Sequence, residues 1–194
     1  MGLAVLLFAS TNVDDIFVLV AFFSDRAFRG REVVAGQVLG MGALIAASVF
    51  LSTVARLVPP RYVGLLGVIP IVLGVFKLVQ RAGSATDEKH LLRPSGGSFG
   101  RGVAVGLTTM ATGGDNIGVY VPMFATRTRP ELAVTIVGFL LLTTVWCAAG
   151  HRLVTHPRSG TLLRLHARRV TPFVFIALGL FILINSRAYS LLGG

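Results

Sequence analysis

The sequence predicts an all-α membrane protein with six transmembrane helices, built as two inverted repeats of three helices each. Three observations lead to this prediction. The chain of 194 residues is 54% apolar and only 13% charged, its mean hydropathy is +0.78, and its two halves share short motifs. Soluble domains of this size have about a quarter of their residues charged. A transmembrane helix needs about 20 apolar residues, so the chain has room for six crossings with short connections.

Six apolar stretches, separated by polar gaps, are the predicted transmembrane helices. They cover residues 3–23, 33–57, 62–79, 103–124, 132–149 and 170–192. The longest polar gap, residues 81–101, is rich in Gly and Ser and is interpreted as a cytoplasmic linker. It separates a first repeat, residues 1–80, from a second repeat, residues 102–194. Because each repeat has an odd number of crossings, the second repeat inserts upside down relative to the first.

Prolines and polar residues mark several boundaries of these stretches. Pro59 and Pro60 separate the second stretch from the third. Pro122 is expected to bend the fourth stretch, and Pro172 suits the first turn of the sixth. Gln37 lies so near the start of the second stretch that we expect it at the membrane interface rather than in the interior.

The charge pattern predicts how the chain is oriented. The chain has 18 Lys and Arg against 8 Asp and Glu, which gives a net charge of +10. These basic residues form no stripe with interleaved aromatics, so nucleic acid is not an expected partner. The gaps after the first, third and fifth stretches hold 12 of them, and the other gaps and the C-terminal end hold 5. Because Lys and Arg concentrate in cytoplasmic loops, both termini are predicted outside.

Two motifs recur in the same order in the two halves. Residues 11–16 (TNVDDI) match residues 112–117 (TGGDNI), which gives the pattern T-x-x-D-D/N-I. Residues 71–76 (IVLGVF) match residues 176–181 (IALGLF) near the end of each half. Inverted repeats of this kind are typical of transporters, whose binding site lies near the midplane where the repeats meet.

Three carboxylates lie inside apolar stretches, and they point to a bound cation. Asp14 and Asp115 are near the middle of the first and fourth stretches, and Asp15 follows Asp14. An Asp at the centre of a bilayer costs about 3 kcal/mol on the insertion scale. The basic residues cluster at the ends of the stretches, so no Lys or Arg is expected to pair with these acids at that depth. A positively charged substrate is the expected compensation.

The predicted metal site combines carboxylates with neutral oxygen ligands. Its residues are Asp14, Asp15, Asp115, Asn116, Asn12, Thr11 and Thr112. Six or so oxygens at one point form a site for a hard divalent cation. Carboxylates held together repel one another, so at least one is expected to take up a proton when the metal leaves. The metal ion is the cargo, protons are the expected counter-ion, and no resident cofactor is predicted.

A purely structural role is the alternative interpretation of the same residues. Asn12 could cap a helix whose first turn contains Asp14 and Asp15, where the helix dipole favours carboxylates. The pair Gly113 and Gly114, followed by Asp115, could likewise mark the restart of a helix. The acids would then stabilise two broken helices. Both interpretations can hold together, because transporters use broken helices to expose backbone at depth.

The two acidic stretches resemble the cadmium resistance transporter family, within the lysine exporter superfamily. The resemblance rests on residues 11–19 (TNVDDIFVL), on residues 113–120 (GGDNIGVY), and on the length and six-span layout. It implies a small, multi-pass protein of the bacterial inner membrane that exports divalent cations and confers cadmium resistance. The resemblance assigns the motif positions to Asp14, Asp15, Asp115 and Asn116.

The ligand chemistry predicts a divalent cation more firmly than it predicts cadmium. Cadmium favours thiolates, yet Cys147 is the one cysteine of the sequence. Oxygen ligands suit manganese, calcium or magnesium better. Because cadmium is close to calcium in size, an oxygen site could accept it without great selectivity.

The leading hypothesis is a secondary carrier that exports a divalent metal, with protons as the exchanged ion. The alternatives are an exporter of an organic cation or amino acid, and a non-transporting membrane scaffold whose buried acids are structural. No catalytic constellation is visible, so an enzyme is not expected. The expected partners are the lipid bilayer and the metal, and the sequence leaves the oligomeric state open, a homo-oligomer included.

Overall fold

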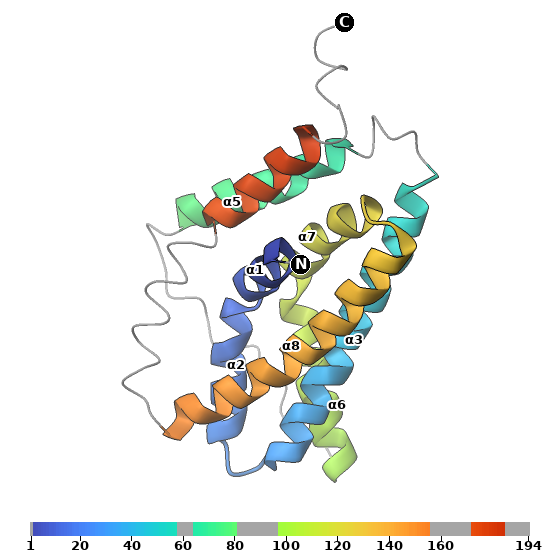
Figure 1. The fold of residues 1–194 in the computed structure, drawn as a ribbon. Helices are drawn as coiled ribbons and strands as arrows, with labels where there is room; N and C mark the ends of the chain where they lie inside the picture. The colour runs from blue at the N-terminus through green and yellow to red at the C-terminus, as the bar shows by residue number, and fades with distance from the viewer. Residues whose placement is uncertain (1, 58–63, 81–96, 156–171, 185–194) are drawn as a thin grey trace, which may run out of the picture.

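The computed structural model describes residues 2–57, 64–80, 97–155 and 172–184. Every regular element in this part of the chain is a helix, which agrees with the predicted all-α class. In chain order the elements are α1 (Gly2–Thr11), α2 (Val13–Ser24), α3 (Gly30–Ala55), the 3-10 turn η1 (Gly64–Gly67), α5 (Val68–Gln80), α6 (Ser98–Thr112), α7 (Gly114–Ala125), α8 (Arg129–Thr155) and a last helix, Pro172–Ile184 (Figure 1).

Two of the described helices are long and apolar enough to cross a membrane. These are α3, with 26 residues, and α8, with 27. The pair α1 and α2, bent by 54° at its break, gives a third candidate if it is counted as one span. The chain is therefore a helical protein with two or three candidate membrane spans in its described part. The six-span inverted layout stays a prediction.

The first and fourth predicted stretches are each divided into two helices. The first consists of α1 and α2, and the fourth of α6 and α7. Helix α6 begins at Ser98, so the last residues of the predicted linker are helical. The rest of that linker, residues 81–96, lies outside the described residues.

The two halves share an order of elements and several local contacts. Each half has a broken helix pair, then a long helix, then a short apolar helix. The third residue of each long helix is a glutamate that accepts a backbone N–H three residues earlier: Glu32 accepts from Arg29, and Glu131 from Thr128, both over 2.9 Å. The sequence correspondence between the halves thus extends to local structure, while their relative orientation stays a prediction.

The long helix of each half packs against the broken helix of the other half. Helix α3 lies along α6 and α7, and α8 lies along α1 and α2 (Figure 1). Glycines allow the close approach of α3 to α6. A Cβ atom added at Gly40 would lie 2.6 Å from the Gly106 carbonyl oxygen and 2.8 Å from the Thr109 Cβ. No larger residue fits there, as expected for small residues at a helix contact.

A cluster of aromatic side chains packs between α1, α7 and α8. The ring of Phe139 lies with its centroid 5.2 Å from that of Phe8 and 4.8 Å from that of Tyr120. Elsewhere, large apolar side chains are exposed: Leu39 of α3 is 66% exposed and Leu141 of α8 is 62% exposed. Apolar exposure of this extent is unusual in soluble monomers and suits helix faces in contact with lipid.

Candidate functional site

Both broken helices are interrupted at the same position of the T-x-x-D-D/N-I motif. Asn12 separates α1 from α2, and its backbone N–H donates to the Phe8 carbonyl over 3.0 Å. Gly113 separates α6 from α7, and its N–H donates to the Thr109 carbonyl over 2.9 Å. Each motif therefore ends one helix and starts the next. Its acidic residues lie in the first turn of the new helix, where the helix dipole favours a negative charge.

The threonine that opens each motif makes equivalent hydrogen bonds to backbone carbonyls. Thr11 Oγ1 lies 3.2 Å from the carbonyl oxygen of Leu7 and 3.1 Å from that of Phe8. Thr112 Oγ1 lies 3.0 Å from the carbonyl oxygen of Thr108 and 3.3 Å from that of Thr109. The carbonyls of Phe8 and Thr109 also accept the backbone N–H groups of Asn12 and Gly113, so each threonine adds a second interaction at the end of its helix.

The two breaks meet in space through side chains. Thr112 Oγ1 donates to Asp15 Oδ1 over 3.4 Å, across 97 residues of sequence. The Tyr120 hydroxyl of α7 lies 3.2 Å from Thr11 Oγ1 and accepts a hydrogen bond from Asn12 Nδ2 over 2.9 Å. Side chains of the two motifs therefore meet in one polar cluster.

Several polar side chains of this cluster are almost completely buried. Asn12 is 1% exposed, Asp15 is 5% exposed and Asn116 is 0% exposed. Within the described residues, neither amide atom of Asn116 has a hydrogen-bond partner, and nor does Asn12 Oδ1. A buried polar atom without a partner costs about 1–3 kcal/mol, so such atoms in a native protein call for an explanation. A bound ligand that supplies the missing interactions is one such explanation.

Asn116 lies on the face of α7 that meets the α1–α2 break. It is four residues before Tyr120, and residues four apart lie on one face of a helix. The Tyr120 hydroxyl is hydrogen-bonded to Asn12 at that break. Asp15 joins the same cluster through its contact with Thr112, and Asp115 is the residue before Asn116.

The three predicted carboxylates do not share one environment. Asp15 is buried, Asp115 is half-buried, and Asp14 is exposed. Successive residues of an α-helix point about 100° apart, so Asp14 and Asp15 cannot both face the cluster. Asp115 Oδ1 accepts the backbone N–H of Asn116 over 2.9 Å. Among the described residues, no three His, Cys, Asp or Glu side chains gather in a group that could hold a metal.

The donors gathered at the breaks are therefore mixed. They comprise a buried carboxylate (Asp15), two buried amides (Asn12 and Asn116) and a buried hydroxyl (Thr11), with the half-buried Asp115 and the exposed Thr112 beside them. Because the set has few carboxylates, it can coordinate a hard cation only if neutral amide and hydroxyl oxygens supply the remaining ligands.

Three residues of this region were not predicted as part of it. Tyr120 could have been found from its spacing to Asn116 within the second motif. Gln37, expected at the interface, is 2% exposed, and its Oε1 accepts a hydrogen bond from Thr109 Oγ1 over 2.6 Å. Trp146 of α8 donates its indole N–H to the Asn12 carbonyl over 2.6 Å. No sequence pattern indicates the Trp146 contact, because it depends on how α8 packs against the break.

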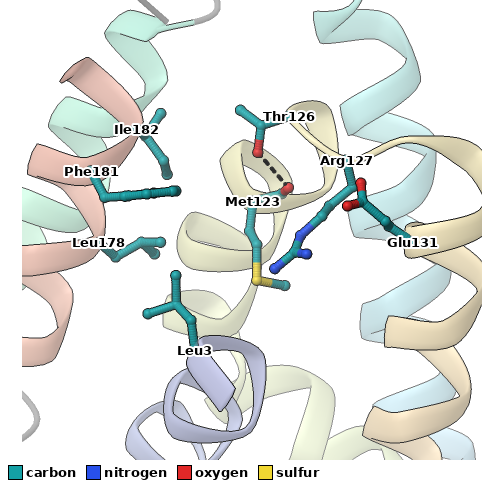
Figure 2. Close-up of a pocket in the computed structure, with 8 residues that line it drawn as sticks. All are labelled: Leu3, Met123, Thr126, Arg127, Glu131, Leu178, Phe181 and Ile182. Atoms are coloured by element: carbon teal, nitrogen blue, oxygen red, sulfur yellow. Dashed lines mark hydrogen bonds between the residues drawn. The ribbon is translucent and has the colours of Figure 1, made fainter. Parts of the chain in front are cut away.

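Sulfur ligands lie outside the cluster. Cys147 is buried in an apolar group with Leu19, Phe22, Val33 and Val105. Met123 belongs to the aromatic core and lines a pocket of about 200 Å³ at the end of α7 (Figure 2). That pocket holds none of the predicted ligands, and Arg127, which also lines it, would repel a cation. Its lining residues are Leu3, Met123, Thr126, Arg127, Glu131, Leu178, Phe181 and Ile182.

The comparison with protein families assigns the chain. A family model described as cadmium resistance transporter matches residues 8–192, a range that includes both helix breaks. The comparisons with curated proteins and with solved structures gave no significant match. The matched family is a class of transporters rather than a class of enzymes. Since the match covers nearly the whole sequence, the chain belongs to the cadmium resistance transporter family.

Proposed function

We propose that this protein is a secondary carrier that exports a divalent cation from the cytoplasm in exchange for protons, and that the ion binds where the two helix breaks meet. The family match supports metal export in general. The cluster of buried polar side chains at the breaks supports the position of the site. The carboxylates of this cluster, which can carry either a proton or a share of the metal's charge, support the coupling to protons.

The observation that carries the proposal is the burial of the Asn116 side chain without hydrogen-bond partners in the described part of the chain. Its side chain is completely buried, and both of its amide atoms lack a hydrogen-bond partner among the described residues. The carbonyl oxygen of this amide could coordinate a cation, whereas the NH₂ group could only donate to a neighbouring acceptor. The buried Asn12 Oδ1, which also lacks a partner there, could supply a second neutral oxygen. Together with the Asp15 carboxylate, these oxygens form the kind of mixed shell that hard cations prefer.

The predicted ligands differ in their proposed roles. Asp15, Asn12 and Asn116 contribute the inner oxygens, because all three are buried. Asp115 contributes negative charge at the edge of the cluster, and the hydroxyls of Thr11 and Thr112 complete it. Asp14 is exposed, so we assign it to the route by which the ion approaches rather than to the binding shell. Charged side chains at membrane depth commonly line such routes.

The donor set favours hard divalent cations and accepts cadmium by size. All donors at the breaks are oxygens, which suit manganese, calcium and magnesium. The Cys147 thiol packs in a separate apolar group, so a thiolate site for cadmium is not part of the proposal. Cadmium would bind at the same oxygens because it is close to calcium in size.

Proton exchange follows from the electrostatics of a buried carboxylate. With the metal bound, Asp15 and Asp115 remain ionised because the cation compensates their charge. When the metal leaves, two negative groups remain in a poorly hydrated region, and burial favours the protonated form of a carboxylic acid. Metal binding would then release a proton, and metal release would take one up.

The proposal places the protein in a bacterial inner membrane as a multi-pass protein with both termini outside. The distribution of Lys and Arg between the gaps supports this orientation. Alternating access would come from movement of the helices around the fixed site. Because each long helix packs on the broken helix of the other half, the moving units would combine elements of both halves.

A structural role for the acids is the alternative to a metal site. Asp14, Asp15 and Asp115 all lie in the first turn of a helix, where they favour the helix dipole without any metal. A non-transporting scaffold would need nothing more of them, and an exporter of an organic cation or amino acid would use them for that substrate instead of a metal. These alternatives predict no metal binding at the breaks.

Efflux from proteoliposomes tests the proposal. Vesicles that contain the purified protein would be loaded with Cd²⁺ or Mn²⁺, and metal release would be followed after a proton gradient is imposed. We expect Asp15→Asn and Asn116→Ala to slow efflux on the order of tenfold or more. Asp25→Asn is the matched control, because Asp25 is an exposed acid that accepts the Ala27 N–H beyond the end of α2. Equal efflux by all four proteins would overturn the proposal.

A further inference from the structure

Tyr120 is buried in the aromatic core, and its hydroxyl reaches the break of the other half. Its ring lies with its centroid 4.8 Å from that of Phe139 and 5.8 Å from that of Phe124. Its hydroxyl oxygen contacts Asn12 Nδ2 at 2.9 Å and Thr11 Oγ1 at 3.2 Å. A residue of α7 is thereby bonded to the residue that separates α1 from α2.

These contacts fix which way the Asn12 amide faces. Its Nδ2 lies 2.8 Å from the Phe8 carbonyl oxygen, and a carbonyl oxygen can only accept a hydrogen bond. The nitrogen of the amide must therefore be the atom on that side. The second amide hydrogen points to the Tyr120 hydroxyl, with Thr11 Oγ1 as a further acceptor at 3.0 Å.

The oxygen of the Asn12 amide, Oδ1, takes no part in these contacts. With both hydrogens of Nδ2 in use, Asn12 Oδ1 is directed away from Phe8 and Tyr120, since the two amide atoms diverge from the same carbon. This oxygen is buried and has no hydrogen-bond partner among the described residues. Its own helix does not use it either, because Asn12 makes no side-chain capping bond to the start of α2.

We infer that Tyr120 is a positioning residue of the cation site: its hydroxyl holds the Asn12 amide so that Oδ1 is presented to the ion. The inference rests on the proposed function of the site. It also gives α7 two roles. Asn116 supplies an oxygen ligand for the ion, and Tyr120, four residues later, orients the oxygen ligand of the opposite break. The hydroxyl does not itself coordinate the ion.

Removal of the hydroxyl alone distinguishes a positioning role of Tyr120 from a role in packing. In Tyr120→Phe the ring keeps its place against Phe124 and Phe139, but the Asn12 amide loses one of its acceptors. The amide nitrogen then keeps its bond to the Phe8 carbonyl but loses its link to α7, so the side chain can tilt about that bond and Oδ1 is no longer held in one place. Metal affinity should fall although the fold is kept.

A double-mutant cycle on metal binding tests the inference. The affinity of the purified protein for Cd²⁺ and Mn²⁺ would be measured by calorimetry for wild type, Tyr120→Phe, Asn12→Ala and the double variant. We expect each single variant to weaken binding on the order of tenfold. The double variant should bind no more weakly than Asn12→Ala, because Tyr120 acts through Asn12. Losses that multiply in the double variant, or an unchanged affinity in Tyr120→Phe, would overturn the inference.

Two further measurements distinguish positioning from loss of structure. Phe139→Leu disturbs the same aromatic packing without removing the hydroxyl, so it should lower the melting temperature and leave the metal affinity unchanged. In wild-type protein, the side-chain amide resonances of Asn12 should shift when Cd²⁺ is added. Resonances of Asn12 that do not shift would contradict the inference.

The proposed function fails separately. It would be overturned as well if the wild-type protein bound no metal, or if Asp15→Asn bound it equally well.

Discussion

The hydroxyl of Thr112 lies 3.4 Å from the carboxylate of Asp15, and this contact joins the end of α6 to the start of α2. Thr112 opens the second motif and Asp15 belongs to the first, so the two copies of the motif face each other at their helix breaks. The contact also identifies which of the two adjacent acids of α2 is directed to the opposite half. The predictions about the site follow from this arrangement.

Asp15 and Asp14 should differ strongly in their effect on metal binding. Asp15 is buried beside Thr112, whereas Asp14 is exposed on another face of α2. Asp15→Asn removes the buried charge and should weaken Cd²⁺ binding on the order of tenfold or more. Asp14→Asn should change the equilibrium affinity by much less, although it can slow transport. Calorimetric titration of both variants measures the difference. A larger loss of affinity in Asp14→Asn would contradict the assignment of the two acids.

Metal binding should release protons, and affinity should fall as the pH is lowered. The carboxylates must be ionised to bind the cation, so protons compete with the metal at low pH. Titrations in buffers with different ionisation enthalpies count the protons released per metal ion. We expect a release that grows towards acidic pH and is smaller in Asp15→Asn. An affinity for Cd²⁺ that does not change with pH would contradict proton exchange at this site.

The close contact of α3 with α6 should not tolerate an added methyl group at Gly40. A Cβ atom there would meet the Gly106 carbonyl and the Thr109 Cβ. Overpacking of this kind costs about 1–3 kcal/mol, so Gly40→Ala should unfold at a lower temperature in detergent. Gly42→Ala is the matched control on the same helix, since a Cβ at Gly42 meets nothing within 4 Å. Equal melting temperatures for the two variants would show that this contact is not tight.

A bidentate ion pair between the halves should stabilise the protein. Glu32 of α3 accepts from Arg101 of α6 through Nε over 2.7 Å and through Nη2 over 2.9 Å. Glu32→Gln should lower the melting temperature by several degrees, and Arg101→Lys should lower it less, since Lys keeps the charge without the paired geometry.

Glu131→Gln is the control for this ion pair. Glu131 is the third residue of α8, as Glu32 is of α3, but within the described part of the chain its hydrogen bonds go to Thr128 of its own segment. We expect a smaller loss of stability in this variant. A loss equal to that of Glu32→Gln would show that the helix start, rather than the contact between halves, accounts for the effect.

The structural interpretation, one of the two that the sequence left open, placed both helix breaks correctly, whereas no pattern showed how the side chains around them are oriented. The repeated T-x-x-D-D/N-I pattern gave both breaks, since Asn, Gly and first-turn acids are local signals for a helix start. It could not separate Asp14 from Asp15, because a helix that is apolar on all sides offers no periodicity to show which face is buried. The break at Asn12 also changes the direction of the helix, so the phase of α1 does not carry into α2.

Contacts between distant segments account for the other differences. Gln37 was expected at the membrane interface from its place near the start of the second stretch. The close packing that Gly40 allows brings α3 near Thr109, which then supplies a buried donor for Gln37. Tyr120 and Trp146 contact Asn12 through the packing of α7 and α8 against the first break. Such contacts depend on the arrangement of helices in space and leave no signal in the sequence.

The most direct test of the account is an anomalous diffraction measurement on crystals of the protein grown with Cd²⁺. The account predicts an anomalous peak between the two helix breaks, within coordination distance of Asp15 and of the amide oxygens of Asn12 and Asn116. This peak should disappear in crystals of Asp15→Asn. Crystals in which Cd²⁺ is found only elsewhere, for instance at His151 or at Cys147, with none between the breaks, would contradict the central claim.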